Sequence, residues 1–280
     1  MVPQATVSVV PMGIRLPPLI DRDDARLLLD LPKNVFILSS ITAVNPYKRL
    51  DVVLRALSRV RKRSPIFMLI AGNVSSHVPL ERWIGVYGLD GAVELLGFVD
   101  DRMARLVAAA SDALVNLRYP TAGETSASLL RLMASGLPVL VSSAGSFTEL
   151  PDGAVSKVPV DVLEEDTLEA MLEAFIADPA LARDLGANGR RFVEERHTIN
   201  HMAVAYHRVL KESVDHLPVP PVVDVVESID LHLPETARGD DIVTDQIARA
   251  MVELELGSDL NVSEAVAQAM VDLGLGPDKM

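Results

Sequence analysis

The stretch that decides the fold is GETSASLLRLMASGLPVLVSS, residues 123–143. It opens with a glycine, a carboxylate and two hydroxyl side chains, and continues over residues 124–135 with the apolar spacing of a helix. It ends in the β-rich run PVLVSS, residues 138–143. A helix that leads directly into a buried strand is typical of the repeating unit of an α/β sheet.

The same alternation continues on both sides of this stretch. Short apolar runs predict strands, and amphipathic runs between and after them predict helices. The strands are expected at 34–41, 66–73, 93–98, 113–118 and 138–143, and the helices at 49–63, 77–88, 101–111, 124–135, 164–178, 179–195 and 199–216. The strand runs are nearly continuously apolar, which favours a parallel sheet buried on both faces. We therefore predict an α/β fold with a Rossmann-like, doubly wound parallel sheet.

The end of the chain has a different character. The segment LPVPPVV, residues 217–223, carries three closely spaced prolines and is typical of a linker. Beyond it, the sequence pattern of residues 242–259 is repeated in residues 261–278, which predicts two short helices. We expect a Rossmann-like domain over 1–217, a Pro-rich linker over 218–223 and an acidic helical repeat tail over 224–280. The repeat serves either as a hairpin within its own domain or as a docking or dimerisation module.

Composition excludes several classes of protein. The net charge is −13, and residues 218–280 hold 13 Asp and Glu against 3 Lys and Arg. This argues against nucleic-acid binding, which needs a basic face. The chain has no cysteine, so it has no disulfide framework and no thiolate metal site. It contains no apolar run long enough to span a membrane, and its N-terminus does not resemble a signal peptide. We expect a soluble, cytoplasmic protein.

Candidate ligand-binding residues follow the predicted strands, because ligands of open α/β sheets bind beyond the carboxyl ends of the strands. Lys48 follows the first strand at the head of a helix, where it could add a positive charge to a phosphate site. The alternative is a solvated lysine on a loop. Asn73 lies in a turn of small residues after the second strand, where a plain turn is at least as good an interpretation. Asp100 or Asp101, after the third strand, could simply cap the next helix.

The polar start of the opening stretch is the main candidate site. Gly123 allows close approach of a backbone, and the carboxylate of Glu124 could accept two hydroxyls of a sugar. The N–H groups of Thr125, Ser126 and Ala127 are predicted to be unpaired donors in the first helical turn, suited to a phosphate or diphosphate. The alternative is that these residues only cap the helix and complement its dipole.

Other catalytic arrangements are not supported by the sequence. A Walker lysine and a G-x-G-x-x-G motif are both missing, which disfavours an ordinary ATPase or dinucleotide enzyme. His197 and His201 are four positions apart, but without the surrounding carboxylates of a metal motif we expect surface or packing roles for them. No Ser-His-Asp arrangement can be defended from spacing.

The order of motifs resembles the C-terminal half of family 4 retaining glycosyltransferases, which have the GT-B fold. The resemblance rests on NPYKRLDVVLRAL, FMLIAGN, LLGFVDD and the long segment AAASDALVNLRYPTAGETSASLLRLMASGLPVLVSSAGSFTELP. It implies a domain that binds a nucleotide-diphosphate sugar, with Lys48 on the diphosphate and the helix start at Glu124 on the phosphates and sugar. It also implies that Phe98 and Val99 lie near the base, and that no metal ion or other cofactor is needed.

Three departures from the family pattern are visible. The family usually places two glutamates eight positions apart across this helix, whereas Glu124 stands one residue late and Arg131 occupies the second place. Arg131 could meet a phosphate or pair with Glu124. A basic residue that is usual near the first strand falls on Ala43. In addition, a GT-B enzyme has an N-terminal domain that holds the acceptor, and only about 33 residues precede the first predicted strand.

The resulting hypothesis is the donor-binding domain of a glycosyltransferase that transfers a sugar from a nucleotide-diphosphate sugar to an unknown acceptor. In this hypothesis Lys48 and Glu124 are the catalytic residues, and an N-terminal acceptor domain is missing. Its partners would be the nucleotide sugar and either an acceptor-domain partner or a second copy bound through the tail. Two alternatives stay open: a non-catalytic interaction module derived from a GT-B half, and a sugar-nucleotide epimerase of the same architecture. The epimerase would need a carboxylate–histidine pair in its active-site cleft, and the sequence offers no clear candidates for such a pair.

Overall fold

The computed structural model describes residues 7–216, with side chains described through residue 213. The chain divides into two units, Met1–Leu217 and Pro218–Met280. The predicted linker at 218–223 and the predicted acidic repeat tail at 224–280 lie outside the described residues, so they stay predictions.

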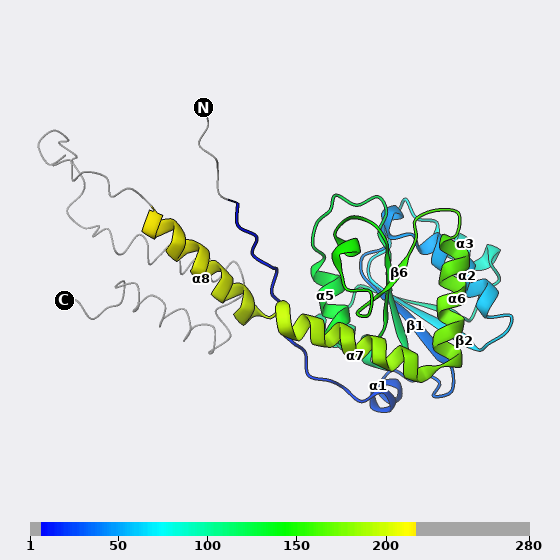
Figure 1. The fold of residues 1–280 in the computed structure, drawn as a ribbon. Helices are drawn as coiled ribbons and strands as arrows, with labels where there is room; N and C mark the ends of the chain where they lie inside the picture. The colour runs from blue at the N-terminus through cyan, green and yellow to red at the C-terminus, as the bar shows by residue number, and fades with distance from the viewer. Residues whose placement is uncertain (1–6, 217–280) are drawn as a thin grey trace, which may run out of the picture. The chain divides into compact units, whose positions relative to one another are not determined.

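A parallel sheet of six strands forms the centre of the described domain (Figure 1). The strands are β1 (Phe36–Ile41), β2 (Ile66–Ala71), β3 (Val93–Gly97), β4 (Ala113–Asn116), β5 (Val139–Ser142) and β6 (Ser156–Val158). Their order is β3-β2-β1-β4-β5-β6, and all neighbouring pairs run parallel. The chain therefore winds outward from β1 toward one edge and from β4 toward the other, which confirms the predicted doubly wound, Rossmann-like fold.

Helices connect the strands and cover both faces of the sheet. They are α1 (Arg22–Leu28), α2 (Leu50–Val60), α3 (Leu80–Val86), α4 (Asp101–Ala110), α5 (Ala127–Met133), α6 (Glu164–Ala177), α7 (Pro179–Arg196) and α8 (Ile199–His216), with two short 3-10 helices at Pro46–Lys48 and Gly145–Glu149. Among the described helices, none is long and apolar enough to cross a membrane.

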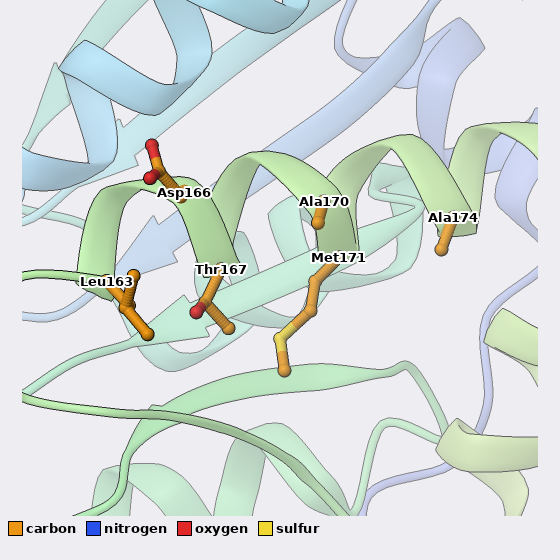
Figure 2. Close-up of a pocket in the computed structure, with 6 residues that line it drawn as sticks. All are labelled: Leu163, Asp166, Thr167, Ala170, Met171 and Ala174. Carbon is orange, nitrogen blue, oxygen red and sulfur yellow. The ribbon is translucent and has the colours of Figure 1, made fainter.

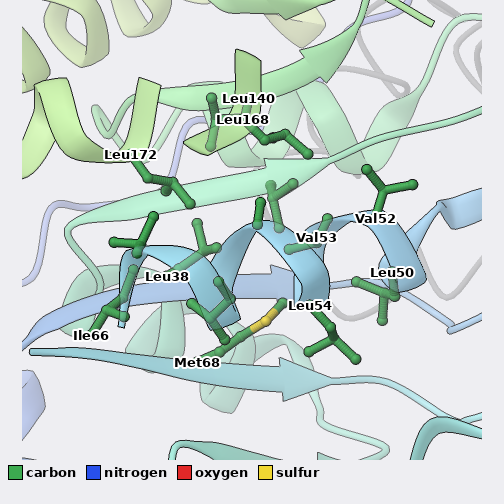
Figure 3. Packing of buried hydrophobic residues seen from close by; sticks show 14 of the residues in the cluster. Leu38, Leu50, Val52, Val53, Leu54, Ile66, Met68, Leu140, Leu168 and Leu172 are labelled. Atoms are coloured by element: carbon green, nitrogen blue, oxygen red, sulfur yellow. The ribbon is translucent and has the colours of Figure 1, made fainter. Parts of the chain in front are cut away.

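The core lies in two layers because successive side chains of each strand point to opposite faces. On one face, Leu38 of β1 packs in a cluster with Val53 of α2 and Leu168 of α6 (Figure 3). On the other face, Ile37 of the same strand packs with Val107 of α4. Figure 1 shows α2, α3 and α6 on one side of the sheet and α5 on the other. Burial on both faces explains the continuous apolar runs of the central strands.

The edge of the sheet departs from the sequence prediction. β3 was predicted, like the other strands, to be buried on both faces, but Glu94 and Leu95 are exposed. The reason is that β3 is an outer strand of the sheet and pairs only with β2. Two short elements, α1 and β6, were not predicted. β6 has only three residues, too few to show a periodic pattern.

Ion pairs join α2 to α6 along the face of the sheet that both helices cover. The basic members are Arg49, Arg55, Arg59 and Arg63, and the acidic members are Glu164, Glu165, Asp166, Glu169 and Glu173. Most of these side chains are half-exposed, where one pair contributes little to stability. Glu164 differs because it is only 3% exposed, and Arg49 neutralises its carboxylate.

Candidate functional site

The site lies where the winding direction of the sheet reverses, between β1 and β4. These strands are neighbours, and the chain leaves their carboxyl ends toward opposite sides of the sheet. In open α/β sheets this is the position at which ligands bind. The segments that reach this position are residues 42–49 after β1 and residues 117–126 after β4.

Lys48 is a buried cation at this position. It ends the 3-10 helix Pro46–Lys48, and the next residue, Arg49, has a left-handed backbone with φ of 57° and turns its side chain away to Glu164. Lys48 is only 4% exposed, and its ammonium lies 5.4 Å from the ring centre of Tyr47. Burial and the positive charge of Arg118 lower the pKa of Lys48 to about 8, although Glu124 acts in the opposite direction. The alternative of a solvated loop lysine is therefore wrong.

Arg118 is the residue at this site that the sequence analysis missed. Its side chain is 11% exposed, and its guanidinium donates to the carboxylate of Glu124 and, at 3.4 Å, to the hydroxyl of Ser126. The guanidinium also lies 5.8 Å from the ring centres of both Tyr47 and Phe147. Arg118 is the last residue of the strand predicted over 113–118, but β4 ends at Asn116. A charged residue at the end of an apolar strand run was the signal that could have found it.

Glu124 is held by three donors of its own loop. Besides Arg118, its carboxylate accepts from the hydroxyl of Thr121 at 3.1 Å and from the backbone N–H of Ala122 at 3.0 Å. Hydrogen bonding from backbone N–H, Thr121 and Arg118 lowers the pKa of Glu124 below its usual value. The Glu124 side chain is 46% exposed, so the carboxylate is ionised, fixed in place and open to a ligand.

The start of α5 lies three residues later than predicted. The helix begins at Ala127, and Ser126 caps it by accepting from the N–H of Leu129 at 3.3 Å. The N–H groups of Thr125 and Ser126 are therefore not first-turn amides, and only Ala127 of the predicted set belongs to the helix. The reason is local: Gly123 adopts φ of 84° in a turn, and the Glu124 side chain bonds back to that turn instead of continuing a helix.

The other predicted residues lie in α5 and in the loops that follow β2 and β3. Arg131 of α5 is 66% exposed and faces Asp101 at 3.8 Å, so it does not take the carboxylate of Glu124, which pairs with Arg118. Asn73 follows β2, where its carbonyl accepts from the N–H of Val44 at 2.8 Å. Phe98, which is 76% exposed, and Val99 follow β3, two strands away from β1. Direct roles for these four residues stay predictions.

Several other predictions have clear outcomes. Asp100 caps α4 through the N–H of Met103 at 2.7 Å, as the capping interpretation proposed. His197 contacts the carbonyl of Met12 at 2.9 Å, and His201 contacts Thr198 at 2.8 Å, which fits packing roles. Residues 7–216 contain no group of three or more His, Asp or Glu side chains that could hold a metal ion.

An apolar hollow of about 430 Å³ lies on α6, away from this cluster (Figure 2). Its lining residues are Leu163, Asp166, Thr167, Ala170, Met171 and Ala174. All belong to α6 or to the residue before it, and none is a residue of the candidate site. The hollow is therefore a feature of the helix surface and separate from the candidate site.

The fold agrees with the comparison to known families. Residues 21–192 match the family described as glycosyl transferases group 1. The matched segment includes β1 to β6 and both loops of the site. The chain belongs to this family.

Individual relatives are distant and longer. An uncharacterized glycosyltransferase of Methanocaldococcus jannaschii is 24% identical over 169 residues, which are 60% of this chain and 43% of that protein. Sucrose-phosphate synthase of Thermosynechococcus elongatus is 23% identical with a TM-score of 0.64, over 74% of this chain and 52% of that chain. HepE of Anabaena, solved with UDP and glucose, is 19% identical with a TM-score of 0.63, and the match covers 75% of this chain and 57% of that chain. The chain thus spans about half the length of these relatives.

A further similar structure is a single domain. The C-terminal domain of a group 1 family glycosyl transferase from Francisella tularensis is 19% identical with a TM-score of 0.58, and the match covers 66% of this chain and 96% of that domain. At these identities the structural likenesses establish the fold, here the Rossmann-like half of a GT-B protein, and leave the ligand open.

Proposed function

We propose that this domain binds a nucleoside-diphosphate sugar and supplies the donor half of a glycosyl-transfer reaction. The observation that carries the proposal is Lys48, a buried lysine at the point where the sheet reverses. Burying a cation without compensation is costly, so this position is best explained by an anion that binds there. Membership of a glycosyltransferase family supports the proposal that this anion is part of a glycosyl donor.

In the proposed reaction, the bond between the sugar and the diphosphate breaks, and negative charge develops on the departing diphosphate. Lys48 would stabilise that charge, and such stabilisation lowers the barrier when it is stronger in the transition state than in the ground state. Glu124 would orient the sugar by accepting its hydroxyls. Because cationic side chains would neutralise the diphosphate, we propose that binding needs no metal ion and is insensitive to EDTA. Retention of configuration is expected only from the resemblance to family 4.

We propose that the acceptor binds to a part of the protein or complex outside residues 7–216. The supporting observation is that the chain matches nearly the whole of the Francisella C-terminal domain but about half of sucrose-phosphate synthase and of HepE. In this proposal residues 7–216 hold the donor, and a second domain or a partner subunit completes the cleft. The described domain alone would then bind donor but transfer little sugar.

A second candidate function is a binding module without turnover. It is favoured by Arg131, which occupies the place of the second family glutamate and lies exposed beside Asp101. Ribose recognition by that position would therefore differ from the family pattern. The two candidates agree on donor binding. They differ in whether free nucleoside diphosphate is released when both the acceptor and the second domain or partner subunit that completes the cleft are present.

The test is a thermal-shift screen with UDP, GDP, ADP and their sugar derivatives. A ligand at about 100 times its Kd should add about 2.7 kcal/mol of stability. We expect a shift with one base, which is lost in Lys48→Met and kept in Lys62→Met, a matched change of an exposed lysine. If the wild-type protein shifts with none of these ligands, the proposed function is wrong.

A further inference from the structure

Arg118 differs from other buried arginines in how few of its donors are used. Arg26 is fully buried, and each of its three nitrogens donates to an oxygen: Nε to Ala110, Nη1 to three backbone carbonyls and Nη2 to Asp112. Such an arginine is fully satisfied by the protein and has a structural role. The side chain of Arg118 is also largely buried, but only its Nη1 and Nη2 atoms have hydrogen-bond partners.

The unused donors of Arg118 are unusual within the described chain. Among residues 7–216, the buried side-chain atoms without a hydrogen-bond partner are Nε of Arg118 and Oδ1 of Asn116. Both residues lie at the carboxyl end of β4, the position at which open α/β sheets bind ligands. A guanidinium has five N–H donors, and a buried polar group normally finds a partner. The contact from Nη2 to Ser126, at 3.4 Å, is also long. Arg118 therefore has donors available for a group that is not part of the chain.

Charge gives the sign of that group. Lys48 and Arg118 lie 5.4 Å and 5.8 Å from the ring centre of the same residue, Tyr47, and a single carboxylate, that of Glu124, pairs with Arg118. Two cations next to one half-exposed carboxylate leave an excess positive charge in a partly buried place. Two like charges in such a place are held more favourably when an anion binds between them.

We propose that Arg118 is a second diphosphate-binding residue of this site, that it acts together with Lys48, and that Glu124 and Ser126 position its guanidinium. This proposal rests on the proposed function, since it assigns a ligand contact in the same donor site. It identifies the recognised part of the donor as two adjacent phosphate groups. A planar guanidinium can donate two parallel hydrogen bonds to phosphate oxygens, whereas an ammonium acts as a point charge.

The experiment compares three ligands of the base found in the screen: the nucleoside, the nucleoside monophosphate and the nucleoside diphosphate. Their Kd values are measured by calorimetry for the wild-type full chain and for Arg118→Gln, Arg118→Lys and the exposed control Arg183→Gln. We expect Arg118→Gln to weaken diphosphate binding about 10- to 100-fold, the range for a lost charge-assisted hydrogen bond. Binding of the nucleoside should not change, Arg118→Lys should recover part of the loss, and Arg183→Gln should behave as wild type.

The outcomes separate this inference from the proposed function. If the wild-type chain binds a diphosphate and Arg118→Gln binds it equally well, the inference is overturned and the proposed function stands. If Arg118→Gln weakens the nucleoside and the diphosphate by the same factor, Arg118 is structural and the inference is again overturned. Arg118→Lys keeps the positive charge. It therefore serves as the test of whether Arg118 contacts the diphosphate if Arg118→Gln does not fold. Wild-type protein that binds none of the three ligands overturns both.

Discussion

The ammonium of Lys48 and the guanidinium of Arg118 lie 5.4 Å and 5.8 Å from the ring centre of Tyr47, although they follow two different strands of the sheet. The positive charge of Arg118 contributes to the lowered pKa of Lys48, second only to burial. Two cations held together in this way destabilise the ligand-free protein. The site can therefore be tested, because removing one of these positive charges should weaken the binding of an anion and increase the stability of the ligand-free protein.

Replacing Lys48 with methionine should abolish diphosphate binding and increase stability. Methionine has a similar length but no charge, so it removes both the cost of burying an ammonium and the repulsion by Arg118. At pH 7 we expect a gain in the free energy of unfolding of roughly 1–3 kcal/mol, measured by urea denaturation. The control Lys62→Met, at an exposed position, should leave binding and stability unchanged. Loss of stability in Lys48→Met would show that the ammonium has a stabilising partner.

The pH dependence of stability checks the same group independently. The pKa of Lys48 is about 8 in the folded protein, below its ordinary value of 10.5 in the unfolded chain. The folded state therefore binds fewer protons between these two values, and wild-type stability should gain from this group as the pH rises from 8 to 10.5. Lys48→Met should lack that gain. Urea denaturation of the wild type and of Lys48→Met between pH 8 and 10.5 measures the difference.

Binding of the sugar nucleotide should weaken as the pH rises above 8. Only protonated Lys48 attracts the diphosphate, and in the ligand-free protein it loses its proton near that pH. Above it we expect Kd to increase by up to about tenfold per pH unit. The sugar nucleotide is the suitable ligand, because its diphosphate is esterified at both ends and carries no terminal phosphate that titrates near neutral pH. Lys48→Arg should remove the dependence, since a guanidinium stays charged. A flat wild-type profile from pH 7 to 9 would contradict the assignment.

The sequence predicted the sheet well because its central strands are buried on both faces, which makes them continuous apolar runs. Ile37 and Leu38, neighbours on β1, are both fully buried on opposite faces. Alternation of such runs with amphipathic helices predicts the winding of an α/β domain. The sequence predicted less where burial does not control the pattern, as in the exposed outer strand β3 and in the three-residue strand β6.

The site could be predicted only in part, for a related reason. Lys48 and the Glu124 segment were found because they follow strands, and strand ends meet at one edge of a parallel sheet. The distance between Lys48 and Arg118 in the sequence gave no sign that they approach the same aromatic ring. The start of α5 was placed too early because Glu124 and Thr125 are compatible with a first helical turn. What prevents that turn is the conformation of the loop: Gly123 has φ of 84°, and the carboxylate of Glu124 accepts from the backbone N–H of Ala122 and from Arg118.

Two helical glycines should respond oppositely to alanine. Gly186 of α7 packs so closely on the turn after α5 that a Cβ would lie 2.2 Å from the carbonyl oxygen of Gly136, whereas a Cβ on Gly85 of α3 would meet nothing within 4 Å. Because Gly136 presents backbone, α7 would have to move, and Gly186→Ala should destabilise the domain strongly. Gly85→Ala should be neutral or stabilise it by up to about 1 kcal/mol through helix propensity. Thermal denaturation of both variants checks the expectation, which fails if Gly186→Ala melts like wild type.

The contacts between α2 and α6 should depend on one ion pair more than on the others. Arg49→Gln would leave the buried carboxylate of Glu164 without its cation, and we expect a loss of about 2–3 kcal/mol, somewhat below the cost of breaking a fully buried pair. Arg63 pairs with Glu169 and Glu173 at a side-chain exposure of 55%, so Arg63→Gln should cost less than about 1 kcal/mol. Urea denaturation measures both. Equal losses would show that burial of Glu164 does not distinguish the two pairs.

Replacing Glu124 with glutamine should separate recognition of the sugar from recognition of the diphosphate. The carboxylate has three donors on the protein and is 46% exposed, so its outward side can accept hydroxyls of a sugar. Glutamine keeps the shape of the side chain but removes one acceptor and the negative charge. Binding of the sugar nucleotide should therefore weaken about tenfold relative to the nucleoside diphosphate. The diphosphate itself should lose much less affinity, because the amide oxygen of glutamine can still accept from Arg118 and hold it, while the negative charge that competes with the diphosphate is gone.

Calorimetric titration of both ligands into wild type, Glu124→Gln and the exposed control Glu81→Gln measures this split. A mere loss of structure would weaken both ligands together, so the ratio of the two Kd values is the informative quantity. Glu81→Gln should leave the ratio unchanged. If Glu124→Gln weakens the diphosphate as much as the sugar nucleotide, then Glu124 acts only by holding Arg118. The sugar would then have to be oriented by another residue.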